Sequence, residues 1–413
     1  MKSQADDSGN TNANDTQHSF KPVIGGLRAL SLSIGGIIGS GIYFILGMAT
    51  EKSGPAVIVS LALAGIIAML TALSFASLGS KIPREGGEYL FVYRAFGPTM
   101  GFVGGLFWIF STSIAAVTVS LAFASYLTAL VPVLDVRVVA AVACLAFMLI
   151  DVVGIRISSA LNAGLVAVKV SILMIFILLG LTFVDASNFH PFVTKGWDGI
   201  LSGTFLIFFA YAGFGKITAA AEEIKNPRRN VPSAIILAVL ISSVIYILVG
   251  FVAVGVSGAS DLSSFAFRNA PLAYVMRSTG FSPAFFIVAV GALTATSSVL
   301  MIQMLGLSRT IYAMSANRQL PTFLSVLHPR FRTPYKAELI LGSLMALGAM
   351  VLDLNSVITL TSLGILGYYC LINMSAIRIR WQEPDGRGVG MAVPILGFLS
   401  CASLIIFSFV IGI

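Results

Sequence analysis

A chain of 413 residues, 57% of them hydrophobic and only 10% charged, is too apolar to fold as soluble domains. We therefore expect a polytopic membrane protein. The formal net charge is +8, but the basic residues are spread among the connections between apolar runs, so they indicate topology and we expect no nucleic-acid partner. The sequence contains no Walker loop, metal-ligand cluster or nucleophile motif, so it supports neither a pump nor an enzyme, and no cofactor is expected.

The predicted elements follow in chain order. Residues 1–20 are polar and are predicted to form a disordered cytoplasmic tail, and residues 21–413 form one transmembrane domain. Hydropathy and helix breakers predict eleven spans in this domain. They cover residues 27–50, 56–80, 101–130, 137–153, 158–183, 199–221, 233–256, 283–313, 337–352, 358–377 and 392–413. The connections 81–97 and 257–281 are expected to contain short helices, the first lying on the inner membrane surface.

The distribution of Lys and Arg predicts the orientation of the chain. Fifteen basic residues lie in connections on the side of the N-terminus, and five lie on the opposite side. Because cytoplasmic loops carry an excess of basic residues, we expect a multi-pass protein of the cell membrane with its N-terminus in the cytoplasm. Arg309, near the end of the span 283–313, is counted here with the inner connections.

Two of the spans carry glycines near their middle. The span 27–50 contains a cluster made of Gly35, Gly36, Gly39 and Gly41. Backbone groups in hydrocarbon must be paired within the protein, so an unwound segment is tolerated only where it lines a cavity. Close helix packing through Gly35-x-x-x-Gly39 is the alternative explanation. The sixth span is interrupted in the same way, at Gly213 and Gly215, and paired interruptions in two halves are typical of transporters with inverted repeats.

Three motifs carry a resemblance to a known family. They are Gly39-Ser40-Gly41-Ile42 in the first span, Pro83-x-x-Gly86-Gly87-x-Tyr89-x-x-Tyr93 after the second, and Glu222-Glu223-Ile224-Lys225-Asn226-Pro227 after the sixth. Together they resemble the amino acid–polyamine–organocation (APC) superfamily of secondary transporters. The resemblance implies an all-α membrane protein with the leucine-transporter fold. Its first repeat would cover 27–183 and its inverted second repeat 199–377, with spans one and six broken and 392–413 as an extra span.

The resemblance also implies where an amino acid substrate would bind. Its α-carboxylate would meet backbone N–H groups around Ser40 and Gly41, with the Ser40 hydroxyl as a further donor. The dipole of the second half-helix agrees with this placement, because a helix N-terminus attracts anions. The α-amino group would meet carbonyls released by unwinding, those of Ile37, Ile38, Gly39, Phe209, Tyr211 and Ala212, beside Gly213. The Phe209 ring would cap the substrate from outside.

Lys169 is a lone cation in the fifth span, roughly 16 Å from the start of that helix and so near the middle of the membrane. A lysine at this depth is costly unless it has a partner. It resembles a fifth-span lysine that takes the place of the coupling cation in sodium-independent relatives, where it would contact unwound carbonyls between Gly35 and Ile38. Two roles are open: a coupling group that sheds and regains a proton, or a permanently charged structural cation in an exchanger.

Two further positions are candidate gating residues. Lys216 follows the sixth-span glycines, and it either has a structural or gating role or faces an acidic substrate side chain. Glu222 and Glu223 lie where this span leaves the membrane. They form either a solvated surface cluster or an inner gate that pairs with Arg84 or Arg94.

The sequence therefore favours a secondary active transporter of neutral amino acids with broad specificity. It would work by alternating access, coupled to protons and independent of sodium. The expected partners are the amino acid, protons and the lipid bilayer. An exchanger and a carrier of polyamines or cationic amino acids are alternatives within the same class. A sensor that binds an amino acid without moving it is the alternative from a different class.

Overall fold

The computed structural model describes residues 22–39, 41–83, 87–153, 155–264, 270–352, 354–383 and 389–411. The predicted tail, Ser40 and Arg84 lie outside these residues. Within them the chain is helical apart from short connections and one isolated bridge between Ile24 and Ile224.

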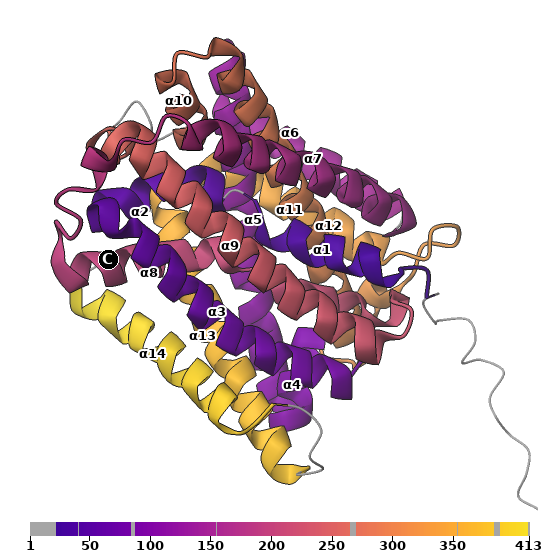
Figure 1. Cartoon of the computed structure of the whole chain (residues 1–413). Helices are drawn as coiled ribbons and strands as arrows, with labels where there is room; N and C mark the ends of the chain where they lie inside the picture. Colours follow the sequence, from indigo (N-terminus) through magenta and orange to yellow (C-terminus); the bar gives the residue numbers. More distant parts are fainter. Residues whose placement is uncertain are drawn as a thin grey trace, which may run out of the picture.

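The helices pack as one bundle (Figure 1). The first half contains α1 (Gly26–Ile37), η2 (Gly41–Ile45), α2 (Leu46–Ser53), α3 (Val57–Lys81), α4 (Gly87–Phe96), α5 (Pro98–Leu130), α6 (Val136–Val153) and α7 (Ile155–Leu181). The second contains α8 (Gly196–Tyr211), η5 (Phe214–Glu223), α9 (Pro227–Leu262), α10 (Pro271–Ser278), α11 (Ser282–Ala316), α12 (Tyr335–Val351), α13 (Leu354–Gln382) and α14 (Ala392–Ile411).

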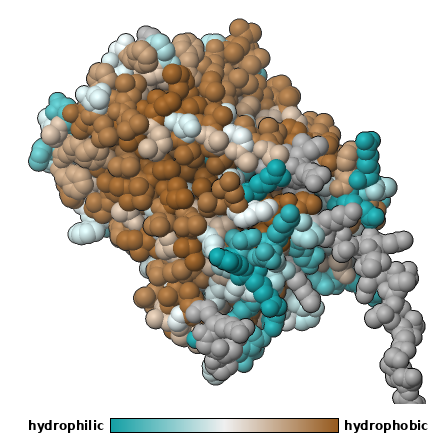
Figure 2. Space-filling view, turned by 45° about the vertical axis from the view of Figure 1, so that its right-hand side comes forward, coloured by the Kyte–Doolittle hydropathy of each residue, from teal (hydrophilic) through white to brown (hydrophobic). Residues whose placement is uncertain are grey.

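Within the described residues, each of the eleven predicted spans is helical, with interruptions in the first and the sixth. Nine helical segments of the described chain are long and apolar enough to cross a membrane, and the first, Gly26–Lys81, contains both the first and second predicted spans. The 17-residue helix α12 supplies the remaining span. Figure 2 shows a broad hydrophobic face, with hydrophilic residues gathered at one end of the molecule. Large apolar side chains such as Leu347 and Phe409 are exposed, as expected where lipid replaces water.

Helix packing follows the predicted inverted repeat. The second span, α3, packs along the seventh, α9; the third, α5, packs along the eighth, α11; and the fourth, α6, packs along the ninth, α12. Three spans of the first half thus pack against their counterparts in the second half. This arrangement, together with the two broken spans described below, confirms the expected fold.

The first of the two predicted short helices differs from expectation in its burial. The connection 81–97 contains the helix α4, but Tyr89, Phe91 and Val92 are fully buried, so α4 is not a surface helix. Helix α4 packs on α5 and α13, and its Tyr89 and Phe91 side chains are buried, whereas Tyr93 is half-buried. The second connection contains α10, as expected.

Candidate functional site

Both predicted helix breaks are present. Helix α1 ends at Ile37, and Ile38 has extended backbone angles (φ −71°, ψ 100°) before the chain resumes helix at Gly41. Helix α8 ends at Tyr211, Ala212 is extended (ψ 142°), and Gly213 has φ 119°. Glycine is favoured at Gly213 because side chains rarely tolerate this left-handed conformation.

The two breaks touch each other. A Cβ atom on Gly213 would lie 2.3 Å from the carbonyl oxygen of Gly36, and one on Gly41 would lie 2.3 Å from Cα of Ala210. Such distances are far shorter than real Cβ contacts, so only glycine allows these approaches. Close packing also explains Gly39, whose Cβ would lie 2.2 Å from Cγ2 of Val299. The glycine cluster therefore serves both the break in the helix and the close packing of the spans.

A small cavity of about 10 Å³ lies at the breaks. It is lined by Gly36, Ile37, Gly39, Gly41, Val119, Phe209, Ala210, Ala212, Val299, Gln303 and Ile365. Five residues that the sequence assigns to the substrate site, Ile37, Gly39, Gly41, Phe209 and Ala212, thus line one cavity. Gln303 supplies the polar side chain, and its Oε1 atom is buried without a hydrogen-bond partner.

The other predicted substrate-site residues that the structure describes lie around this cavity rather than in its wall. The Tyr211 side chain points toward α3, where its hydroxyl donates to the carbonyl of Leu61 at 3.1 Å. Ile38 offers its carbonyl to Lys169, and Gly213 lines a second cavity described below.

Tyr246 of α9 links the two breaks and is not among the residues that the sequence singles out. Its hydroxyl lies 2.9 Å from the carbonyl oxygen of Ile37 and 3.0 Å from that of Ala210. The carbonyl of Phe209 also has a partner, the backbone N–H of Ala212 at 3.1 Å. Each carbonyl oxygen keeps a second lone pair, so it can still accept a hydrogen bond from a substrate ammonium.

Lys169 of α7 lies at the break of α1 and is fully buried. Its Nζ donates to the carbonyl of Gly35 at 3.1 Å. It also donates to the carbonyl of Ile38 and to the hydroxyl of Ser298 on α11. These three acceptors match the three donors of an ammonium group. Lys169 therefore joins α1, α7 and α11 at one point.

A second small cavity of about 20 Å³ shares Ala212 and Ile365 with the first. Lys216 and Glu88 both line it. Burial raises the pKa of the Glu88 carboxyl to about 8, although the Lys216 ammonium acts in the opposite direction. Three buried polar atoms of its lining have no hydrogen-bond partner, namely Glu88 Oε2, Ser111 Oγ and the Tyr368 hydroxyl. The Lys216 ammonium thus lies near the carboxyl group of Glu88.

At the end of the sixth span, Glu223 is not part of a solvated cluster and does not pair with Arg94, whereas Arg84 lies outside the described residues. Glu223 is buried and pairs with Arg309, and Glu222 beside it is half-buried. Arg94 pairs instead with Glu383 at 2.7 Å. Arg309 is not a loop residue, because it lies inside α11 and is 1% exposed. A buried arginine is stable here because carboxylates compensate its charge, so counting it with the loops was wrong.

Comparisons with known proteins give matches over nearly the whole chain. A sequence model of the family described as amino acid permease matches residues 24–413. The chain is 30% identical to the branched-chain amino acid permease BcaP of Bacillus subtilis, over 95% of this chain and 90% of that protein. It is 32% identical to cationic amino acid transporter 4 of Homo sapiens, over 91% of this chain and 63% of that protein. The methylthioribose transporter of Bacillus subtilis is 29% identical, over 86% of this chain and 80% of that protein.

Proposed function

The chain belongs to the amino acid permease family of the APC superfamily, and we propose that it moves neutral amino acids across the cell membrane together with protons and without sodium. Members of this family are transporters and not enzymes. The relatives are named for branched-chain amino acids, cationic amino acids and methylthioribose, so their names do not define one substrate. The residues that line the first cavity give a better indication of the substrate class.

The residues that line the first cavity suit an amino acid with an uncharged side chain. The backbone of Gly41 begins the second half-helix, whose free N–H groups and positive dipole end favour the substrate carboxylate. The other walls are apolar apart from Gln303, and no acidic side chain is among the lining residues. A cationic side chain would need a carboxylate there. Glu88 lies in the neighbouring cavity, where Lys216 opposes its charge.

The observation that carries the coupling proposal is the position of Lys169 Nζ between two carbonyls of the broken α1 and the Ser298 hydroxyl. As an ammonium it satisfies all three acceptors. After losing a proton it would present a lone pair, and at least one acceptor would lose its donor. Proton loss at Lys169 therefore loosens the contact of α1 with α7 and α11. This is how protonation would bias the movement of the broken span.

Uptake into proteoliposomes tests the proposal. We expect a labelled amino acid mixture to accumulate in sodium-free buffer under an inside-alkaline pH gradient, and a protonophore to abolish the accumulation. Lys169→Ala should lose accumulation, whereas Lys52→Ala, which changes an exposed lysine, should behave like the wild type. Exchange with amino-acid-loaded vesicles but no accumulation would make the protein an exchanger with Lys169 as a fixed cation. Binding without either activity would indicate a sensor.

A further inference from the structure

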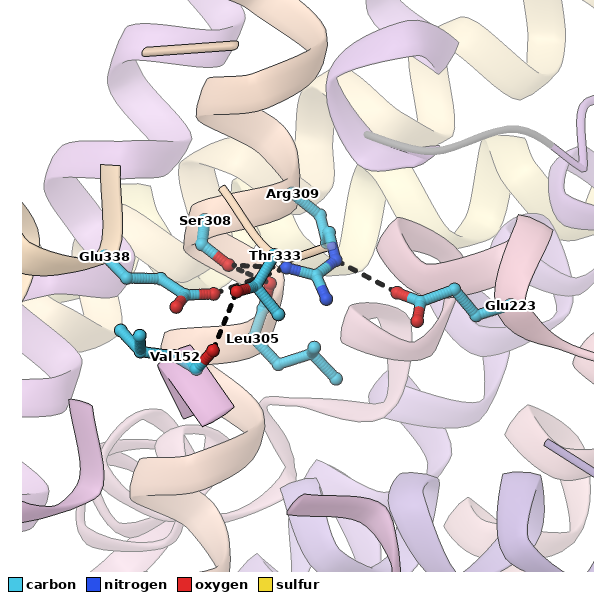
Figure 3. Close-up of polar contacts among 7 residues, drawn as sticks. All are labelled: Val152, Glu223, Leu305, Ser308, Arg309, Thr333 and Glu338. Carbon is cyan, nitrogen blue, oxygen red and sulfur yellow. Dashed lines mark hydrogen bonds and ion pairs between the residues drawn. The ribbon is translucent and has the colours of Figure 1, made fainter. Parts of the chain in front are cut away.

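Three helices meet at a buried cluster of charged side chains that the proposed function does not use (Figure 3). Arg309 of α11 lies between Glu223, at the end of η5, and Glu338, in the first turn of α12. Its Nε donates to Glu223 Oε1 at 3.0 Å, and its Nη1 donates to Glu338 Oε1 at 3.3 Å. The side chains of Arg309 and Glu338 are 1% exposed and that of Glu223 is 4% exposed.

The charges of this cluster do not balance. A guanidinium stays protonated in proteins, so Arg309 contributes one positive charge against two carboxylates. Among the described residues, the charged groups that act on the carboxylates are Arg309, the other carboxylate and, for Glu223, the neighbouring Glu222. The packed elements α4, η5 and α6 carry three more buried ionisable side chains, Glu88, Lys216 and Asp151. An uncompensated carboxylate in this buried site is costly, and binding of one cation would remove that cost.

The hydrogen bonds indicate that this cation is a proton. Glu338 Oε2 is buried and has no hydrogen-bond partner among the described residues, whereas the other oxygen of the same carboxyl accepts from Arg309. A metal ion would require several oxygen ligands at once, and the described residues contain no group of three His, Cys, Asp or Glu side chains that could hold one. A proton needs a single oxygen. Each carboxylate also disfavours ionisation of the other, which favours a proton on one of the two.

We propose that Glu223, Arg309 and Glu338 form a proton-binding site that holds one exchangeable proton, carried by Glu338. The site lies away from the cavity at the helix breaks, and none of its three residues lines that cavity. The proton-binding site is inferred from the contacts among these three residues and does not depend on the role of Lys169.

The position of the site couples the proton to helix movement. Glu223 ends the broken sixth span, whereas Arg309 and Glu338 belong to α11 and α12, which pack on α5 and α6. If η5 moves away and takes Glu223 with it, Arg309 and Glu338 remain as an ion pair without net charge. The proton on Glu338 is then released. The conformation in which η5 is separated from α11 and α12 therefore becomes more stable as the pH on this side of the membrane rises. We assign this side to the cytoplasm, from the distribution of basic residues.

Infrared difference spectroscopy of the purified protein in lipid tests the site without any transport measurement. The measurement uses a Glu88→Gln background, because burial also raises the pKa of Glu88. In this background the protein should show at low pH the carbonyl stretch of a neutral carboxylic acid, and this band should be lost as the pH rises. Glu338→Gln keeps the shape and neutrality of the protonated side chain, and it should remove this band. Glu383→Gln changes a partly exposed carboxylate paired with Arg94 and should leave the band unchanged. An unchanged band in Glu338→Gln would overturn the assignment.

Amino acid exchange at different internal pH values provides the second measurement. One exchangeable proton predicts that the wild-type exchange rate rises with internal pH by up to about tenfold per pH unit across the titration step. Glu338→Gln should vary less than about twofold over the same range, and Glu383→Gln should retain the wild-type slope. An unchanged slope in Glu338→Gln would exclude the proposed coupling. Exchange needs no proton gradient, so failure of the Lys169 proposal would not alter these outcomes.

Discussion

The ammonium nitrogen of Lys169 lies 3.1 Å from the carbonyl oxygen of Gly35, although 134 residues separate them in the chain. The contact joins the fifth span to the segment where the first span loses its helical hydrogen bonds. A freed carbonyl in a membrane needs a donor from elsewhere in the protein, and Lys169 is that donor. The same side chain thereby stabilises the break that forms one wall of the first cavity.

The first prediction concerns this contact. Lys169→Ala removes the donor from three acceptors, and we expect proton-driven accumulation to fall at least tenfold while downhill movement of substrate persists (about 1.4 kcal/mol or more of lost coupling). The measurement is uptake with and without a pH gradient. Lys52→Ala is the matched control, because Lys52 is exposed in the last turn of α2. Accumulation at the wild-type level in Lys169→Ala would remove this lysine from the mechanism.

The second prediction concerns the approach of the two broken spans. Gly41→Ala places a methyl group 2.3 Å from Cα of Ala210, so the spans must separate. We expect a loss of about 1–3 kcal/mol of stability and weaker substrate binding, as is usual for overpacking. Gly164→Ala is the control, because a Cβ there meets nothing within 4 Å. Thermal unfolding and ligand-induced stabilisation measure both effects, and unchanged binding in Gly41→Ala would contradict the placement of the carboxylate.

The breaks and Lys169 can be located from the sequence for a simple physical reason. Glycine clusters and lone charges are easily recognised within long apolar spans. Both destabilise a membrane helix unless the protein supplies partners for the freed backbone groups or for the charge. Gly41, Gly213 and Lys169 are therefore visible without coordinates. The resemblance to the APC superfamily, and not hydrophobic periodicity, predicts that these three residues lie close together.

The partners of these residues could not be predicted in the same way. Tyr246 and Ser298 contact segments 209 and 129 residues away in the chain. Both lie in spans that are apolar on nearly every side, so periodicity does not define which way a side chain faces. Arg309 was assigned to a loop because charges near span ends are usually exposed. Its second carboxylate partner, Glu338, lies in a different predicted span, and only the packing of α11 against α12 brings them together.

The third prediction concerns the link made by Tyr246. Tyr246→Phe removes a buried hydroxyl that lies within 3.0 Å of carbonyls in both broken spans. We expect a loss of about 1 kcal/mol of stability from the missing hydrogen bond, and a slower transport cycle because the breaks are less firmly joined. Tyr93→Phe is the control, because Tyr93 is only half-buried on α4. Thermal unfolding and exchange rates measure the two effects. Equal values for the two variants would show that the hydroxyl does not join the breaks.

The fourth prediction concerns the pH dependence of stability through Glu88. Burial raises the pKa of this carboxyl from 4.5 to about 8 in the folded protein, and Lys216 opposes the shift. Between these values the folded state binds more protons than the unfolded state, so the Glu88 contribution to stability falls as the pH rises. Tyr368 and Tyr369 also face this carboxyl and do not ionise in that range.

Glu88→Gln keeps the size of the side chain but cannot titrate, so we expect its unfolding temperature to decline less between pH 5 and about 8 than that of the wild type. Glu383→Gln is the control, because Glu383 is partly exposed and paired with Arg94 and Lys81. Thermal unfolding of the purified protein across this range measures the slope for each protein. A wild-type slope in Glu88→Gln would mean that Glu88 stays ionised and that Lys216 compensates its charge fully.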